Sequence, residues 1–144
     1  MINFKERVLL QLKEKGFKLT GPRMQVVDFL EKAEIAYTPY EIRDFLAKEG
    51  VKADVVTIYR VLEVLEEIGL VHKVNSIGRF SKCNIEDDKH LCHHYLVCEK
   101  CNRVLEFEGE DLEELEDKIA KKTGFKISSH YLEFRGICSK CESI

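Results

Sequence analysis

Apolar residues recur at every third or fourth position through the first 68 residues, which is the spacing of amphipathic helices. Three of these stripes follow Thr20, Thr38 and Asp54, residue types that cap helix N-termini. Glycines follow the first, third and fourth stripes and are expected to end those helices. We expect four helices, of which the third covers residues 39–48 and the fourth residues 54–68. Their apolar faces are Phe4, Val8 and Leu12; Met24, Val27 and Leu30; Ile42, Phe45 and Leu46; and Ile58, Val61, Leu62, Leu65 and Ile68.

Two short runs after the fourth helix predict a β-hairpin, with strands at residues 70–74 and 79–83 and a turn at residues 75–78. Helices followed by a hairpin are the layout of a winged helix-turn-helix. In that arrangement residues 54–68 form the recognition helix, whose first turns enter the major groove of DNA. The pattern alone also allows a small helical domain that binds protein.

The second half changes its period. We expect strands at residues 93–98 and 103–107, a helix at residues 111–122 and a long strand at residues 125–138. Such a module is too small to be stable alone and needs zinc, a partner subunit or both. The predicted fold is therefore α+β: a winged helix-turn-helix domain at 1–84, a hinge at 85–91, and a small α/β metal-binding dimerisation domain at 92–144.

Two C-x-x-C pairs are the strongest chemical signal in the chain. Cys98 and Cys101 form the first pair, and Cys138 and Cys141 form the second. Four thiolates at this spacing make a closed tetrahedral zinc site, which holds a fold together and leaves no open position for catalysis. We expect one structural Zn²⁺ per subunit. The alternative is a pair of redox dithiols.

Composition and motif content argue against a membrane protein, a secreted protein and an enzyme. The net charge is −3, no apolar run is long enough to cross a membrane, and the N-terminus does not have the pattern of a signal peptide. Cysteines at metal-binding spacing favour a cytoplasmic protein. The chain contains neither a P-loop, nor G-x-S-x-G, nor H-E-x-x-H, nor the zinc deaminase motifs, so we expect no enzyme and no small-molecule substrate.

The chain resembles the ferric uptake regulator family over nearly its whole length. The residues that carry the resemblance are Leu19-Thr20-x-x-Arg23, Thr57-Ile58-Tyr59-Arg60, Gly69-Leu70-Val71, His93-His94-Tyr95-Leu96-Val97-Cys98-Glu99-Lys100-Cys101 and Gly136-Ile137-Cys138-x-x-Cys141. The resemblance implies a dimeric, metal-dependent repressor that binds operator DNA. Its expected DNA-contacting residues are Arg23, Thr57, Tyr59 and Arg60.

The regulatory metal site departs from the iron-sensing form of the family. Residues 34–37 lack the usual histidine, Cys83 replaces a carboxylate, and Tyr95 replaces a histidine. The remaining pattern resembles the zinc-sensing branch. Its implied ligands are His72, Cys83, Glu106 and a hinge histidine, His90 or His93, with His94 also within reach.

Ligand chemistry agrees with this interpretation. A thiolate, imidazoles and a carboxylate suit Zn²⁺ better than Fe²⁺ or Mn²⁺, which prefer more oxygen ligands. By the resemblance, His130 matches a further metal position of the family, and His94, Cys92 and Glu113 are its candidate partners in a second site. The alternatives are an iron- or peroxide-responsive regulator of the same family and a redox-switched zinc protein.

Overall fold

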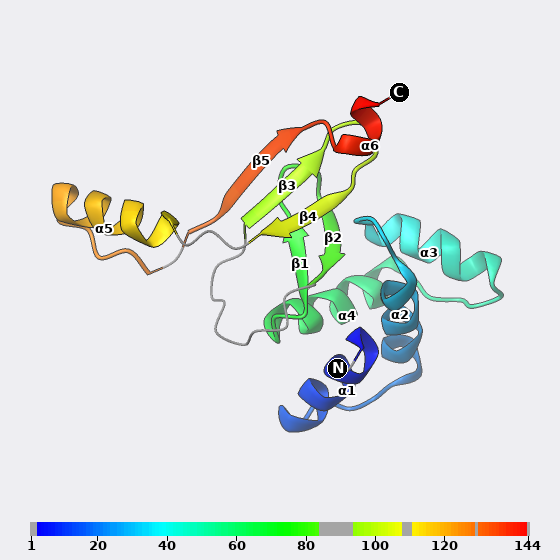
Figure 1. Cartoon of the computed structure of the whole chain (residues 1–144). Coiled ribbons are helices and arrows are strands. Elements are labelled where there is room, and N and C mark those ends of the chain that lie inside the picture. The colour runs from blue at the N-terminus through cyan, green and yellow to red at the C-terminus, as the bar shows by residue number, and fades with distance from the viewer. Residues whose placement is uncertain (1–2, 84–93, 108–110, 129, 144) are drawn as a thin grey trace. The chain divides into compact units, whose positions relative to one another are not determined.

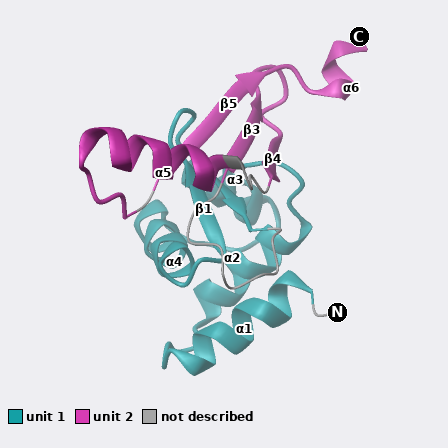
Figure 2. Ribbon diagram, turned by 60° about the vertical axis from the view of Figure 1, so that its left-hand side comes forward, with its two compact units in different colours: residues 1–84 teal, residues 85–144 magenta. Residues whose placement is uncertain are grey.

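The computed structural model describes residues 3–83, 94–107, 111–128 and 130–143. The chain divides into two compact units, residues 1–84 and residues 85–144 (Figure 2). The first unit contains helices α1 (Phe4–Glu14), α2 (Gly21–Lys32), α3 (Pro39–Lys48) and α4 (Val55–Glu67) and strands β1 (Val71–Val74) and β2 (Arg79–Lys82) (Figure 1). The second contains β3 (His94–Cys98), β4 (Val104–Phe107), α5 (Asp111–Thr123), β5 (Leu132–Gly136) and α6 (Ser139–Glu142).

Side-chain caps fix where the four helices of the first unit begin. Asn3, Thr20, Thr38 and Asp54 each accept a hydrogen bond from the main-chain N–H three residues later. At α3 the Glu41 carboxylate returns the bond to the N–H of Thr38 over 3.0 Å, which completes a capping box. Each cap contributes about 1 kcal/mol and satisfies N–H groups that a helix end leaves open. The caps predicted at Thr20, Thr38 and Asp54 are confirmed.

The apolar stripes meet in one core that the four helices and the hairpin share. The largest fully buried side chains include Leu12, Leu30, Ile42, Ile58, Leu62 and Leu65. One prediction was wrong. Phe45 is 44% exposed, because Ile42 and Leu46 form the buried face of α3 and the Phe45 ring lies at its edge, against Phe29 and Tyr37. On α2, Val27 and Leu30 are buried and Met24 is half-buried, and Val26, which was not predicted, is buried as well.

The predicted hairpin is confirmed and forms a wing that is attached to the helices. β1 and β2 are antiparallel, with Val71 opposite Lys82 and Val74 opposite Arg79. Tyr37 forms an antiparallel bridge with Phe80: the N···O distance is 3.0 Å from the Tyr37 nitrogen to the Phe80 carbonyl and 2.8 Å in the reverse direction. The Arg79 guanidinium forms an ion pair with Glu41. The wing and the start of α3 are therefore joined by main-chain and side-chain contacts.

The second unit is built on a three-stranded sheet in the order β4–β3–β5. β3 is antiparallel to β4 and parallel to β5. A parallel pair needs a crossover, and α5 lies within it. Of the strand predicted at residues 125–138, the described residues form β5 at Leu132–Gly136, whereas Phe125 is 74% exposed. The short helix α6 was not predicted.

Across one face of this sheet Leu105, Leu96 and Phe134 stand in a single row, as the strand registers require. All three side chains are exposed in the single chain. An apolar row of this kind is suited to burial against another subunit. Among the described residues, no helix has the length and apolar character required to cross a membrane.

Candidate metal centres and nucleic-acid surface

The four cysteines of the two C-x-x-C pairs meet in the second unit. Cys98 ends β3 and Cys101 follows in the turn, while Cys138 precedes α6 and Cys141 lies within it. Their sulfur atoms all lie within 4.8 Å of one another, and those of Cys101 and Cys138 are 3.8 Å apart. Zinc–sulfur bonds of about 2.3 Å in a tetrahedron require sulfur atoms about 3.8 Å apart. The cluster therefore fits a zinc ion without rearrangement of the fold.

Main-chain donors prepare this cluster for a cation. The N–H of Cys138 donates to the Cys98 sulfur over 3.3 Å and, with the N–H of Cys101, lowers the pKa of Cys98 to about 6. The N–H of Cys141 lowers the pKa of Cys138. The Cys141 thiol donates in turn to the Cys138 sulfur, which raises the pKa of Cys141 to about 12. A bound metal ion offsets the negative charge of the thiolates and so favours loss of the Cys141 proton.

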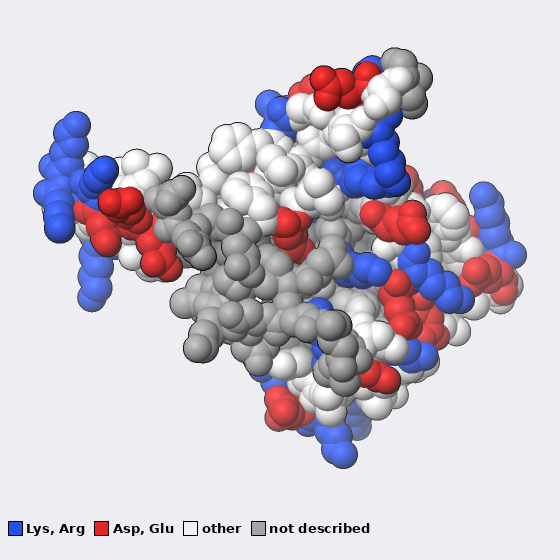
Figure 3. Space-filling model, in the orientation of Figure 1, with Lys and Arg blue, Asp and Glu red and all other residues white. Residues whose placement is uncertain are grey.

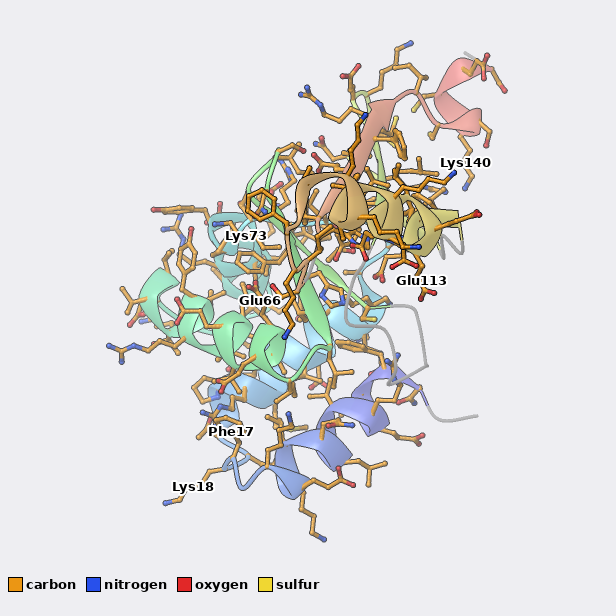
Figure 4. All side chains as sticks on the ribbon, turned by 90° about the vertical axis from the view of Figure 1, so that its left-hand side faces the viewer. Phe17, Lys18, Glu66, Lys73, Glu113 and Lys140 are labelled. Atoms are coloured by element: carbon orange, nitrogen blue, oxygen red, sulfur yellow. The ribbon has the colours of Figure 1, made fainter. Side chains whose placement is uncertain are left out.

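In the first unit, two of the predicted sensing ligands lie side by side on the wing. His72 is on β1 and Cys83 follows β2 directly, and both are buried. Because Leu70 lies opposite Cys83 and side chains alternate along a strand, His72 and Cys83 share one face of the hairpin. A His72 ring nitrogen and the Cys83 sulfur lie within 4.8 Å of each other. Lys73, labelled in Figure 4, is exposed on the same strand.

The remaining predicted sensing ligands belong to the second unit. Glu106 is on β4 and is half-buried. His90 and His93 lie outside the described residues, as does Cys92. Their meeting with His72 and Cys83 stays a prediction.

A third cluster joins His94, His130 and Glu116 within the second unit. The Nε2 atoms of the two histidines are 2.5 Å apart, and their rings are parallel with centroids 4.8 Å apart. The Nδ1 atom of His130 contacts the Glu116 carboxylate. A carboxylate on the second nitrogen of a histidine fixes the ring and raises its basicity, which is typical of histidines that bind metals.

Glu116 was not among the predicted ligands. Glu113, one turn earlier on α5, was the predicted candidate, and its side chain is exposed (Figure 4). Glu116 is half-buried and lies four residues after Leu112, on the inner side of the helix. This helical spacing was the available signal, because it separates an inward carboxylate from the outward ones.

The expected DNA-contacting residues lie at the start of α4 and on α2. Tyr59 is 37% exposed and Arg60 is exposed, whereas Thr57 is half-buried and its N–H donates to Asp54 over 2.7 Å. That bond also lowers the pKa of Asp54. The Arg23 guanidinium lies 5.5 Å from the centroid of the Phe17 ring and donates to the Lys18 carbonyl. Positive and negative side chains are interspersed on the face shown in Figure 3, so charge alone does not mark a DNA surface on that face.

Replacing Arg60 by alanine tests this surface. We expect Arg60→Ala to weaken operator binding by roughly 1–3 kcal/mol in a sequence-dependent way if the guanidinium contacts a base. A contact with phosphate would instead give a uniform loss and a smaller salt dependence. Fluorescence anisotropy with operator and scrambled DNA measures both, and Lys13→Ala removes an exposed cation of α1 as the control. Unchanged operator affinity in Arg60→Ala would place the recognition surface elsewhere.

Comparison with known proteins agrees with the geometry. The sequence profile of the Ferric uptake regulator family matches residues 14–135. The ferric uptake regulation protein of Neisseria gonorrhoeae is 39% identical over 136 residues, which are 94% of this chain and 93% of that protein. The zinc uptake regulation protein of Escherichia coli K12 is 28% identical over 131 residues, which are 91% of this chain and 77% of that protein.

Solved structures give the same assignment. A zinc uptake regulator complexed with zinc and DNA superposes with a TM-score of 0.85 at 27% identity, covering 96% of this chain and 93% of that one. The α+β fold, with a DNA-binding unit before a dimerisation unit, is thereby confirmed. The chain belongs to the ferric uptake regulator family of metal-dependent, DNA-binding transcription regulators.

Proposed function

We propose that this protein is a zinc-responsive repressor that binds operator DNA as a homodimer. The observation that carries the proposal is the pairing of His72 with Cys83 on the wing, where an imidazole nitrogen and a sulfur lie within 4.8 Å. With Glu106 and a hinge histidine, His90 or His93, they make a four-coordinate set. Nitrogen, sulfur and one carboxylate favour Zn²⁺ over Fe²⁺ and Mn²⁺.

The four cysteines of the second unit hold a structural Zn²⁺ in each subunit. Their role is to close the module, since a site with four protein ligands has no free position for a reacting molecule. The family consists of transcription regulators, which supports the absence of catalysis. A protein that acts on operator DNA works in the cytoplasm. The exposed row of Leu105, Leu96 and Phe134 supports a homodimer.

Linkage explains how metal controls DNA binding in this proposal. Ligands on the wing and on the dimerisation unit that share one ion fix the angle between the two units. In a dimer that angle sets the spacing of two recognition helices against operator half-sites. Metal favours DNA only through its higher affinity for this arrangement, and DNA must tighten metal binding by the same factor.

The cluster of His94, His130 and Glu116 is a second candidate for a divalent ion. The Nε2 atoms of its two imidazoles face each other, and the carboxylate orients the His130 ring. Imidazole nitrogens bind Zn²⁺ and Fe²⁺ alike, so this cluster does not define the sensed metal.

An iron-responsive regulator is the second candidate function. The identity of 39% to a ferric uptake regulation protein favours it, against 28% to a zinc uptake regulation protein. The thiolate among the wing ligands opposes it. A redox-switched zinc protein is a third candidate, favoured by the lowered pKa of Cys98, because thiolates are the form that oxidants attack.

Metal titration of operator binding tests the proposal. Purified protein with only its tightly held zinc should bind operator weakly, and added Zn²⁺ should increase the affinity by about 5- to 150-fold, the usual range of allosteric coupling. Metal content is counted in parallel before and after a chelator. A response to Fe²⁺ or Mn²⁺ with none to Zn²⁺ would contradict the proposal. Loss of binding after mild peroxide, with release of zinc, would favour the redox switch.

A further inference from the structure

Both main-chain polar groups of Cys83, its N–H and its carbonyl, are hydrogen-bonded. Its N–H donates to the Leu70 carbonyl over 2.8 Å, which closes the base of the wing hairpin. Its carbonyl accepts a hydrogen bond from the Arg7 guanidinium over 3.2 Å. Arg7 is on α1 and stands 76 residues away in the sequence. A side chain whose peptide groups are fixed in this way has a restricted direction.

The preceding residue, Lys82, contacts both α2 and α1. The Lys82 ammonium donates to the Glu31 carbonyl, in the last turn of α2, over 2.7 Å. It also lies 6.0 Å from the centroid of the Phe4 ring, a cation–π contact. Phe4 and Arg7 are three residues apart and share one face of α1. The end of the wing is therefore clasped by α1 at two points and by α2 at one.

The helix that supplies this clasp is itself firmly placed. Phe4, Val8 and Leu12 of α1 are buried in the shared core, and a capping box at Asn3 fixes the first turn of the helix. Arg7 therefore reaches Cys83 from a fixed base. The bond joins a charged donor to a main-chain carbonyl, which is stronger than a bond between neutral groups.

We infer that Arg7 is a positioning residue for the metal-sensing cysteine: it holds the peptide of Cys83 so that the sulfur stays beside the His72 ring. The inference rests on the proposed function, in which Cys83 and His72 bind the regulatory ion. A ligand that is already ordered loses less conformational freedom when the metal binds. α1 is then part of the sensor, although it carries no ligand.

Cobalt binding tests this role without DNA. Co²⁺ is added to the full-length protein with zinc retained in the four-cysteine site, and the thiolate-to-cobalt absorption reports the bond to Cys83. We expect Arg7→Ala to lower the Co²⁺ affinity of the sensing site by about 10-fold or more, the usual effect of losing a group that orients a ligand. The absorption band should also weaken or shift. Arg7→Lys keeps a charged donor and should recover most of the affinity.

Controls separate positioning from general stability. Lys5→Ala removes another cation of α1, one that forms an ion pair with Asp28 on α2, and should leave Co²⁺ affinity unchanged. Thermal unfolding is measured for every variant, and Arg7→Gln provides a second substitution that keeps an N–H donor. Wild-type affinity and spectrum in Arg7→Ala would overturn the inference. So would losses that follow the unfolding temperature across all variants, including Lys5→Ala.

A different variant, Cys83→Ser, tests the proposed function independently of the role of Arg7. If Cys83→Ser keeps the thiolate-to-cobalt band and the affinity, Cys83 is not a ligand and the proposed sensing site is wrong. If Cys83→Ser loses them and Arg7→Ala does not, the sensing site stands and only the positioning role is rejected.

Discussion

Replacement of Cys138 by serine is expected to remove zinc from the second unit and to unfold that unit or release the subunits as monomers. Cys138 contributes one of the four sulfurs, whereas its main-chain N–H, which donates to the Cys98 sulfur, is retained by serine, so the substitution removes the ligand alone. Zinc bound by four thiolates contributes about 10–16 kcal/mol to folding, which equals or exceeds the net stability of most domains. Zinc content, circular dichroism and sedimentation measure the three effects together.

The neighbouring Ser139→Ala variant is the matched control, because Ser139 is exposed at the start of α6 and is not a ligand. The Ser139→Ala variant should retain its zinc, its folded structure and its dimeric state. The pH dependence gives an independent check. A thiol with a pKa of about 12, as at Cys141, is protonated at neutral pH and must lose its proton when zinc binds. Apparent zinc affinity should therefore rise with pH, and a well-folded zinc-free dimer of Cys138→Ser would reject the structural role.

The helices of the first unit could be predicted because local signals agree. Thr38 and Asp54 cap helices whose apolar spacing continues for three turns, and the structure begins α3 and α4 directly after them. The four-cysteine cluster could be predicted for a similar reason. Each C-x-x-C pair is a local unit that favours one geometry, so only the meeting of two pairs depended on the fold.

The features that the sequence did not reveal depend on long-range contacts. Phe125 and Ile127 alternate with polar residues as strand residues do, yet they lie outside β5, which pairs with β3 over Leu132–Gly136. Register is a property of two strands and cannot be read from one.

The choice among acidic residues on α5 is a problem of the same kind. Glu116 contacts His130 across 14 residues, and Arg7 reaches Cys83 across 76. No local pattern marks either pair. Helical spacing shows which carboxylates face inward, but only the packed fold shows what they meet.

Cys83→Ser and His72→Ala are each expected to abolish the zinc response of DNA binding while leaving the four-cysteine zinc and the dimer intact. Both residues are buried on the wing, and their removal deprives the sensing site of a sulfur or a nitrogen ligand. Losing a direct ligand should cost more than the roughly 10- to 100-fold in metal affinity that losing an orienting partner costs. Weak DNA binding should remain, because neither residue belongs to α4.

The two substitutions differ in their effect on metal preference. A serine hydroxyl is a poorer and harder ligand than a thiolate, so Cys83→Ser should shift the remaining preference away from zinc. Ser81→Ala is the matched control: Ser81 is buried in the same hairpin, directly opposite His72, and offers no metal ligand of comparable strength.

Zinc titration of operator binding, with the metal content of each variant measured in parallel, distinguishes a ligand from a packing residue. If Cys83→Ser responds to zinc as the unmodified protein does, then Cys83 serves only in packing. The cluster of His94, His130 and Glu116 then becomes the better candidate for the sensor, because the Nε2 atoms of its two histidines face each other and Glu116 orients one of the rings.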